Sequence, residues 1–298
     1  MKWEGERQSD NVEDRRGSDS GPGGGGLRVG GRSIGVGTIV VALLGGWLFG
    51  INPLTVLSLL SGGDAPAPQV QQAPGQRPPK EDRAAAFVST VLANTEDVWN
   101  PIFRSGGAGA GARYVDPKLV LFRGRTNTAC GLGDTASGPF YCPGDQQVYI
   151  DLAFFDTLRS QLGAPGDFAQ AYVVAHEVGH HVQNLLGVTA KIDGMRGRIS
   201  QTQMNALSVR VELQADCLAG VWAHHSQKGK AWLEQGDLEE ALNAAAKIGD
   251  DTLQRQARGT VVPESFTHGT SAQRVTWFRR GLDGGSIGQC NTFDARSL

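Results

Sequence analysis

The chain has 298 residues, of which 40% are hydrophobic and 19% are charged, a composition typical of a globular protein with one or two domains. Its 28 basic residues nearly balance its 30 acidic residues, so the formal net charge is −2. The sequence has no basic stripe with interleaved aromatic residues, and composition and charge therefore exclude nucleic acid as an expected partner.

The first part of the chain differs from the rest. Residues 1–33 are polar and glycine-rich without hydrophobic periodicity, so we predict a disordered cytoplasmic tail. The segment from Ile34 to Ile51 contains no charged residue, and an apolar run extends it to residue 60. At about 1.5 Å per residue, a helix of this length approaches the thickness of a bilayer core, about 30 Å. A buried core helix is the alternative, but the flanking segments offer it no packing partner. We therefore predict a transmembrane helix over 34–60.

Basic residues predict how this helix is oriented. Arg28 and Arg32 precede it, and the next basic residue is Arg77, so the positive-inside rule places the N-terminus in the cytoplasm. Because no small-residue cleavage site follows, we expect an uncleaved signal anchor. A proline-rich linker over 61–81 then leads to a folded domain over 82–298. We expect a single-pass protein of the inner (cytoplasmic) membrane, with this domain on the periplasmic or extracytoplasmic side.

All four cysteines lie in the folded domain, which agrees with export to an oxidising compartment. Cys130 and Cys142 are close in sequence across a turn-rich stretch, and this favours a bridge between them. Cys217 and Cys290 would then form the second bridge. Alternatively, Cys217 is a buried free thiol, because it falls within a helical pattern.

Hydrophobic periodicity predicts an α+β domain that is mostly helical with a small sheet. Asp167, with Gln170 three residues later, is expected to cap the helix that carries the central motif. The expected strands are 118–122 and 147–152, and the expected helices are 81–103, 153–162, 167–187, 203–226, a helix from 237 and 271–281.

The central motif is H-E-x-x-H, formed by His176, Glu177 and His180. Its spacing places the two imidazoles one turn apart on the same helix face, where both can bind one zinc ion. Glu177 lies beside the first ligand and can act on a metal-bound water. His181 points about 100° or more away from both histidines, so we expect it to be a packed or surface residue.

A third ligand is expected downstream. Glu212 and Asp216 follow the i, i+4 spacing within an otherwise apolar stretch, where unpaired carboxylates would be costly to bury. Carboxylates on a helix face are commonly just solvated. Here the pattern favours Glu212 as the third zinc ligand and Asp216 as the residue that orients a ligand histidine.

Four blocks of this sequence, in order, resemble the bacterial membrane-anchored neutral zinc metallopeptidases, which are similar in motif order to the gluzincins. The resemblance covers about residues 82–298 and leaves out the tail and the linker. It implies a compact zincin-like, minigluzincin-like domain with one zinc ion per chain and Glu177 as catalytic base. The blocks are GPFYCPGDQQVYIDLAFFDTL, AQAYVVAHEVGHHVQNLLG, SVRVELQADCLAGVWAHH and FTHGTSAQRVTWFRRG.

The last block contains His268 in a loop before a predicted helix, with Arg274 six residues later. Hydrolysis of an acyl group develops negative charge on the carbonyl oxygen, and a second electrophile opposite the metal lowers that barrier. On this chemistry and on the resemblance, His268 is predicted to be that electrophile. Alternatively, His268 only binds backbone atoms, and Arg274 pairs with a carboxylate such as Asp216 or with a helix end.

The sequence therefore predicts a membrane-anchored zinc-dependent endopeptidase that acts on a peptide or protein substrate. The strand over 147–152 is a candidate edge that would hold an extended substrate by backbone pairing. Two alternatives stay open. One is a zinc hydrolase of a non-peptide or cell-wall amide bond, and the other is a non-catalytic binding module stabilised by zinc.

Overall fold

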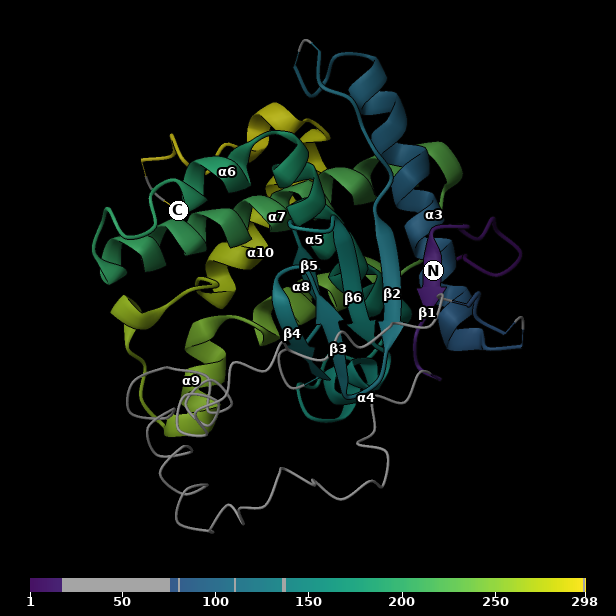
Figure 1. The fold of residues 1–298 in the computed structure, drawn as a ribbon, viewed down its shortest axis with the longest axis horizontal. Coiled ribbons are helices and arrows are strands. Elements are labelled where there is room, and N and C mark those ends of the chain that lie inside the picture. The colour runs from purple at the N-terminus through teal and green to yellow at the C-terminus, as the bar shows by residue number, and fades with distance from the viewer. Residues whose placement is uncertain (18–75, 80, 110, 136–137, 297) are drawn as a thin grey trace, which may run out of the picture. The chain divides into compact units, whose positions relative to one another are not determined.

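The structure is a computed structural model that describes residues 1–17, 76–79, 81–109, 111–135, 138–296 and 298 (Figure 1). The predicted transmembrane helix over 34–60 and most of the predicted linker lie outside these residues. Among the helices that are described, none combines the length and the apolar character needed to span a bilayer.

The main sheet is built from strands whose apolar residues alternate between two faces. Residues 119 and 121 face a large core shared with the helices, while residues 120 and 122 face a smaller cluster on the other side. The first three strands in spatial order are parallel, and the last is antiparallel to its neighbour. That order is β1 (Val12–Asp14), β2 (Lys118–Phe122), β6 (Gln147–Asp151) and β5 (Phe140–Cys142), and a separate hairpin consists of β3 (Arg125–Thr128) and β4 (Gly131–Asp134).

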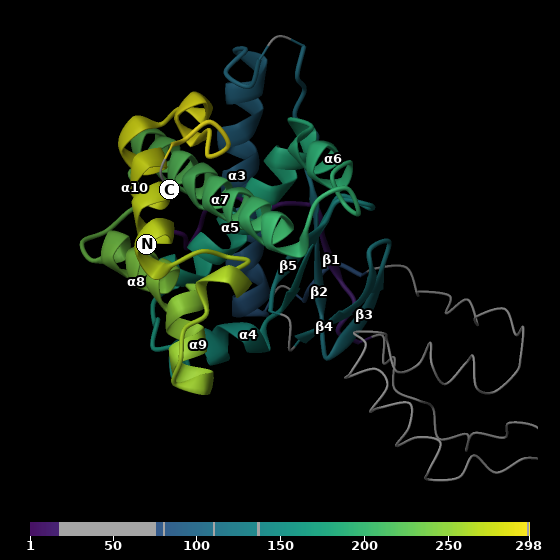
Figure 2. The ribbon, with the colours of Figure 1, turned by 90° about the vertical axis from the view of Figure 1, so that its left-hand side faces the viewer.

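Helices cover one face of this sheet. In Figure 2 the sheet stands to one side of α5, while α8 and α10 lie on the other side. The helices are α3 (Arg83–Arg104), α4 (Ala153–Ser160), α5 (Asp167–Leu185), α6 (Val188–Asp193), α7 (Gln201–Lys230), α8 (Asp237–Lys247), α9 (Asp250–Arg258) and α10 (Ser271–Gly284), with 3-10 turns at Pro263–Ser265 and Ile287–Cys290.

Local sequence explains how several helices begin. Ser200 and Gln203 form a capping box for α7, and Thr270 with Gln273 does the same for α10. Helix α5 differs from its prediction, because Asp167 is the first helical residue rather than the cap. The carboxylate of Glu240 on α8 instead accepts a hydrogen bond from the Phe168 N–H at 3.1 Å.

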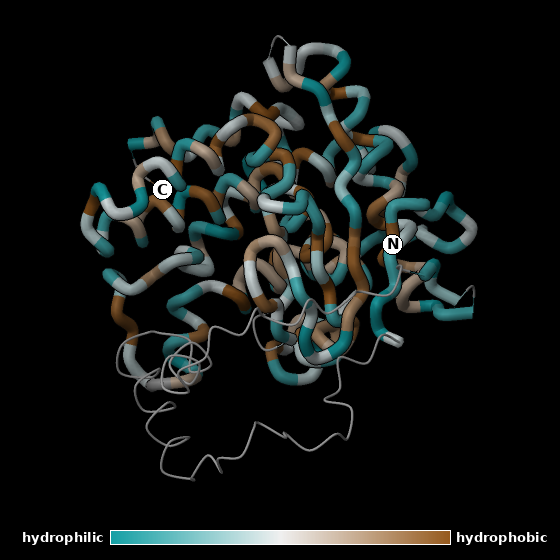
Figure 3. Tube along the Cα trace, viewed as in Figure 1, coloured by the Kyte–Doolittle hydropathy of each residue, from teal (hydrophilic) through white to brown (hydrophobic). Residues whose placement is uncertain are grey.

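The core lies between α3, α5, α7 and the helical face of the sheet. Figure 3 shows apolar residues, in brown, along β2 and in the central helices beside it. Three fully buried tryptophans contribute to it, at positions 99, 222 and 232. The ring of Phe168 stacks on that of Trp222, with 5.7 Å between the ring centroids. This contact links the start of α5 to α7.

Residues 1–17 are folded onto this core, so the predicted disorder of residues 1–33 is wrong over this part. Strand β1 pairs with β2, and the ring of Trp3 packs edge-on against that of Phe87, with 5.2 Å between the ring centroids. The segment contributes only a few apolar side chains, and much of its docking comes from backbone pairing and polar contacts to Glu96. An analysis of hydrophobic periodicity does not detect contacts of this kind, because they involve backbone and polar groups.

The predicted α+β class, mostly helical with a small sheet, is confirmed. Both predicted strands and the predicted long helices are present, although α7 is longer at both ends than expected. The elements β1, β3, β4, β5, α6 and α9 are not among the predicted ones, because these short segments lack the runs of β-forming or periodic apolar residues that mark β2, β6 and α4.

Both predicted disulfide bridges are present. Cys130, in the turn of the β3–β4 hairpin, is bonded to Cys142 on β5. Cys217 on α7 is bonded to Cys290 after α10, so the alternative of a free thiol at Cys217 is wrong. The first bridge ties the hairpin to strand β5, and the second ties the C-terminal end of the chain to α7.

Candidate metal centre

The candidate site forms where α5 and α7 cross at close range. Gly179 lies at this crossing, where an added Cβ atom would stand 2.9 Å from the carbonyl oxygen of Ala215. Because glycine has no side chain, the two helix backbones can approach closely. This approach brings Glu212 on α7 opposite His176 and His180 on α5.

These three predicted ligands converge. Their potential ligand atoms all lie within 4.8 Å of one another. The Nε2 atom of His176 is 3.2 Å from one Glu212 oxygen, and the Nε2 atom of His180 is 3.6 Å from the other. Two imidazole nitrogens and one carboxylate oxygen are the donor set of catalytic zinc sites, so the residues present fit a zinc ion.

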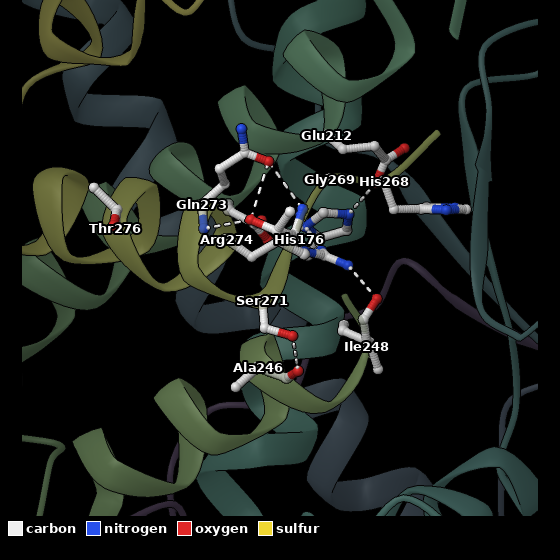
Figure 4. A network of polar contacts seen from close by, with 12 residues as sticks. His176, Glu212, Ala246, Ile248, His268, Gly269, Ser271, Gln273, Arg274 and Thr276 are labelled. Atoms are coloured by element: carbon white, nitrogen blue, oxygen red, sulfur yellow. Dashed lines mark hydrogen bonds and ion pairs between the residues drawn. The ribbon is translucent and has the colours of Figure 1, made fainter. Parts of the chain in front are cut away.

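The first histidine is held by a buried ionic network, and Figure 4 shows His176 between two of its neighbours, Glu212 and Arg274. His176 Nδ1 is 2.9 Å from Asp216 Oδ1, and Arg274 donates to both Asp216 oxygens at 2.8 and 2.9 Å. Tyr172 donates to the same carboxylate. Burial alone would raise the pKa of Asp216, but the charges of Arg274 and His176 lower it to about 2. The structure therefore places Asp216 against His176, and it places Arg274 against Asp216, the pairing that the sequence offered as the alternative for Arg274.

Sequence reasoning missed the partner of the second histidine. His180 Nδ1 is 2.8 Å from Gln183 Oε1, and Gln183 in turn donates to the carbonyl of Val211 at 2.7 Å and to Gln214 at 3.0 Å. Gln183 follows His180 by three residues on the same helix, and that spacing is a signal that could have identified it. Each ligand histidine thus has an orienting side chain, one charged and one neutral.

Glu177 is buried beside the ligands but faces a cleft of about 860 Å³, which it helps to line. Among the described residues, none donates a hydrogen bond to its carboxylate. Burial raises its pKa, although the nearby histidines His180 and His176 oppose that shift. A carboxylate that is weakly solvated and has no other hydrogen-bond partner is suited to accept a proton and to release it again.

His181 is fully buried and lies apart from the ligand set, as expected. Its Nδ1 accepts a hydrogen bond from the hydroxyl of Tyr141 at 3.0 Å, and its Nε2–H donates to the carbonyl of Val115 at 2.6 Å. Burial lowers its pKa to about 4, so the ring is neutral. Because Tyr141 belongs to β5, His181 fixes that strand against the helix that carries the ligands.

His268 lies on the rim of the same cleft. Its Nδ1 is 3.2 Å from Asp250 Oδ1 and 3.0 Å from the Thr267 hydroxyl, and its side chain is 51% exposed. The hydrogen bond with Asp250 raises its pKa, against the effect of burial. In Figure 4 its ring points away from His176. The structure therefore brings His268 to the cleft but not into contact with the ligands.

One wall of the cleft is formed by strand β5 and the residues around it, including Gly138, Phe140 and Tyr141. Strand β5 is an edge of the sheet, whereas β6 lies between β2 and β5 with both sides paired. The prediction that 147–152 is the substrate edge is therefore wrong. The edge that faces the cleft is β5, which the sequence did not reveal because it is only three residues long.

The helical fold with its small sheet, together with the paired histidines on α5 and the glutamate on α7, defines a metal-site protein of the H-E-x-x-H class. The chain belongs to the family described as "Putative neutral zinc metallopeptidase", whose model matches residues 1–293. It is therefore a zinc peptidase by family, as the resemblance implied. No solved structure matches the chain.

Two relatives show how far the similarity extends. The uncharacterized protein YpfJ of Escherichia coli K12 is 52% identical over 295 residues, which cover 98% of this chain and 99% of the relative. The uncharacterized protein Rv2575 of Mycobacterium tuberculosis H37Rv is 40% identical over 266 residues, which cover 84% of this chain and 86% of the relative. Since the family match begins at residue 1, the limit of 82–298 given to the resemblance was too narrow.

Proposed function

We propose that the protein is a zinc-dependent endopeptidase in which Glu177 is the general base. Family membership supports a zinc peptidase. The observation that carries the mechanism is the convergence of His176, His180 and Glu212 beside a Glu177 carboxylate that faces the cleft.

In this proposal His176, His180 and Glu212 hold one zinc ion. When bound, zinc supplies a Lewis acid that polarises the substrate carbonyl and lowers the pKa of water toward about 7. Glu177 accepts the proton of the attacking water and passes it to the leaving amine. Asp216 and Gln183 keep the two imidazole rings in place throughout.

His268 and strand β5 are proposed to act on the substrate. In its protonated form, held by Asp250, His268 donates a hydrogen bond to the carbonyl oxygen as negative charge develops there. A side-chain rotation into the cleft would be needed, because the ring now points outward. Strand β5 offers backbone groups on its free edge, which can pair with an extended peptide.

We also propose that the catalytic domain works outside the cytoplasm and is attached to the membrane through residues 34–60. Two disulfide bridges that use all four cysteines support an oxidising compartment. The long uncharged run in the sequence supports the attachment.

The test compares two substitutions in the full-length chain. Glu212→Ala removes a ligand and is expected to lose most of the bound zinc, whereas Glu177→Gln is expected to keep one zinc per chain and lose hydrolysis. Zinc is measured by atomic absorption, and hydrolysis is measured by mass spectrometry on a library of unstructured peptides.

Zinc-loaded Glu177→Gln that still cleaves peptides at the wild-type rate would show that the mechanism is wrong. If the wild-type protein holds zinc but cleaves no peptide, the reaction class must be sought among other amide bonds.

A further inference from the structure

The segment of residues 1–17 is integrated into the catalytic domain by contacts along its whole length. The Lys2 N–H donates to the Trp232 carbonyl at 2.9 Å, near the start of the segment. Further along, β1 pairs with β2 in parallel, with Val12 opposite Leu119. At its end, Arg16 forms an ion pair with Asp82, the N-cap residue of α3, at 2.6 Å.

The domain contains a buried carboxylate that is satisfied by this segment. Glu96 on α3 is only 5% exposed. Its carboxylate accepts hydrogen bonds from Arg7 and Asn11, each at 2.9 Å, and from Ser9. Within the described part of the chain, all donors to this carboxylate come from residues 7–11. A buried charge without these partners would be costly, so the domain requires the segment.

The chain leaves and re-enters this domain at one place. Asp14 and Gln76 form an antiparallel bridge, with N–O distances of 2.7 and 3.4 Å. The residues before and after the predicted membrane segment are thus hydrogen-bonded to each other. A single membrane crossing between them would put residues 1–17 and the catalytic domain on opposite sides of the bilayer, and none of these contacts could then form.

We infer that residues 1–17 and the catalytic domain occupy the same side of the membrane. The chain between Gly17 and Gln76 therefore crosses the bilayer an even number of times or not at all. This topology replaces the single-pass topology with a cytoplasmic N-terminus that the positive-inside rule predicts. It does not depend on zinc binding or on catalysis.

Single-cysteine labelling of the full-length chain tests the inference. Among the described residues no cysteine is free, so an introduced one is the thiol that reacts. Asp10→Cys reports on the N-terminal segment, where this side chain is 82% exposed, and Asp156→Cys on α4 reports on the domain, where it is 73% exposed. Spheroplasts of a Gram-negative host are treated with a membrane-impermeant maleimide before and after lysis.

We expect both thiols to react before lysis. Reaction of both only after lysis would support the inference and contradict the extracytoplasmic proposal. Reaction of Asp156→Cys before lysis and of Asp10→Cys only afterwards would overturn the inference.

A second measurement tests the docking itself in detergent-solubilised full-length protein. Val12→Asp places a charge at a position that is 6% exposed on β1, so it is expected to lower the Tm by several degrees. Asp10→Asn, at an exposed position, is the matched control and should leave the Tm unchanged. A Tm for Val12→Asp equal to that of the wild type would also overturn the inference.

Discussion

At the scale of single residues, the two ligand histidines are held in different ways. Asp216, which is charged and itself held by Arg274, orients His176, whereas the neutral Gln183 orients His180. Such partners fix the ring orientation and the tautomer of a ligand and commonly influence metal affinity by about 10- to 100-fold.

Gln183→Leu is therefore expected to weaken zinc binding by about 10-fold or more, since His180 loses its acceptor. Affinity is measured by competition with a chromophoric chelator, and folding is checked by circular dichroism. Gln183→Glu keeps the acceptor for His180 but loses the N–H donors to Val211 and Gln214, so it should bind zinc more tightly than Gln183→Leu and lower the stability of the fold. Gln170→Leu, on the same helix but away from the site, is the control. Unchanged affinity in Gln183→Leu would leave Gln183 with a packing role only.

His268 and Asp250 predict a pH dependence. The hydrogen bond with Asp250 raises the pKa of His268 above its usual 6.5, so the protonated form persists to higher pH. If this form assists catalysis, kcat/KM falls as pH rises through the raised pKa. Asp250→Asn is expected to move this alkaline limb to lower pH, and His268→Ala should reduce kcat by about 100-fold with zinc retained.

The control for this profile is Glu264→Gln, which removes a nearby exposed carboxylate and should leave the alkaline limb in place. An Asp250→Asn profile identical to that of the wild type, with an unchanged rate in His268→Ala, would assign His268 a structural role.

At the scale of elements, the metal centre depends on the distance between α5 and α7. Gly179→Ala would place a methyl group 2.9 Å from the Ala215 carbonyl oxygen and so push the helices apart. We expect a loss of about 1–3 kcal/mol in stability and weaker zinc binding, because Glu212 moves away from the histidines. Gly229→Ala on α7, where an added Cβ meets open space, is the control and should be neutral or stabilising. Chemical unfolding and zinc competition measure both effects, and equal results for the two variants would contradict this account.

Strand β5 connects the elements around the cleft. It is bonded to β6, to the hairpin through Cys130–Cys142 and to α5 through Tyr141 and His181. The histidine that follows the H-E-x-x-H motif thus positions the wall of the cleft rather than the metal. These three attachments hold the free edge of β5 in a constant place relative to Glu177, as substrate pairing would require.

At the scale of the whole molecule, the N-terminal segment and the domain form one folding unit. Residues 1–17 and the described residues from 76 onwards belong to one compact unit. The family match from residue 1 to 293 agrees with this, since it includes the segment that polar composition alone made look disordered. A domain preparation that starts at residue 82 would therefore leave Glu96 without its partners, which is why the experiments use the full-length chain.

Features that depend on spacing along one helix, or on two cysteines close in sequence, could be predicted without the fold. His176 and His180 share a helix face because of the 3.6-residue period, Glu177 lies next to the first of them, and Glu212 stood out as a carboxylate in an apolar stretch. The Cys130–Cys142 bridge followed from the short spacing of these cysteines, whereas the sequence left Cys217 open between a bridge to Cys290 and a free thiol.

The folded structure was needed to show which strand edge faces the cleft and that residues 1–17 complete the sheet. These features arise from contacts between segments distant in sequence, or from polar groups without a periodic pattern. Local propensity does not encode such contacts, because their free energy appears only when the whole domain has brought the partners together.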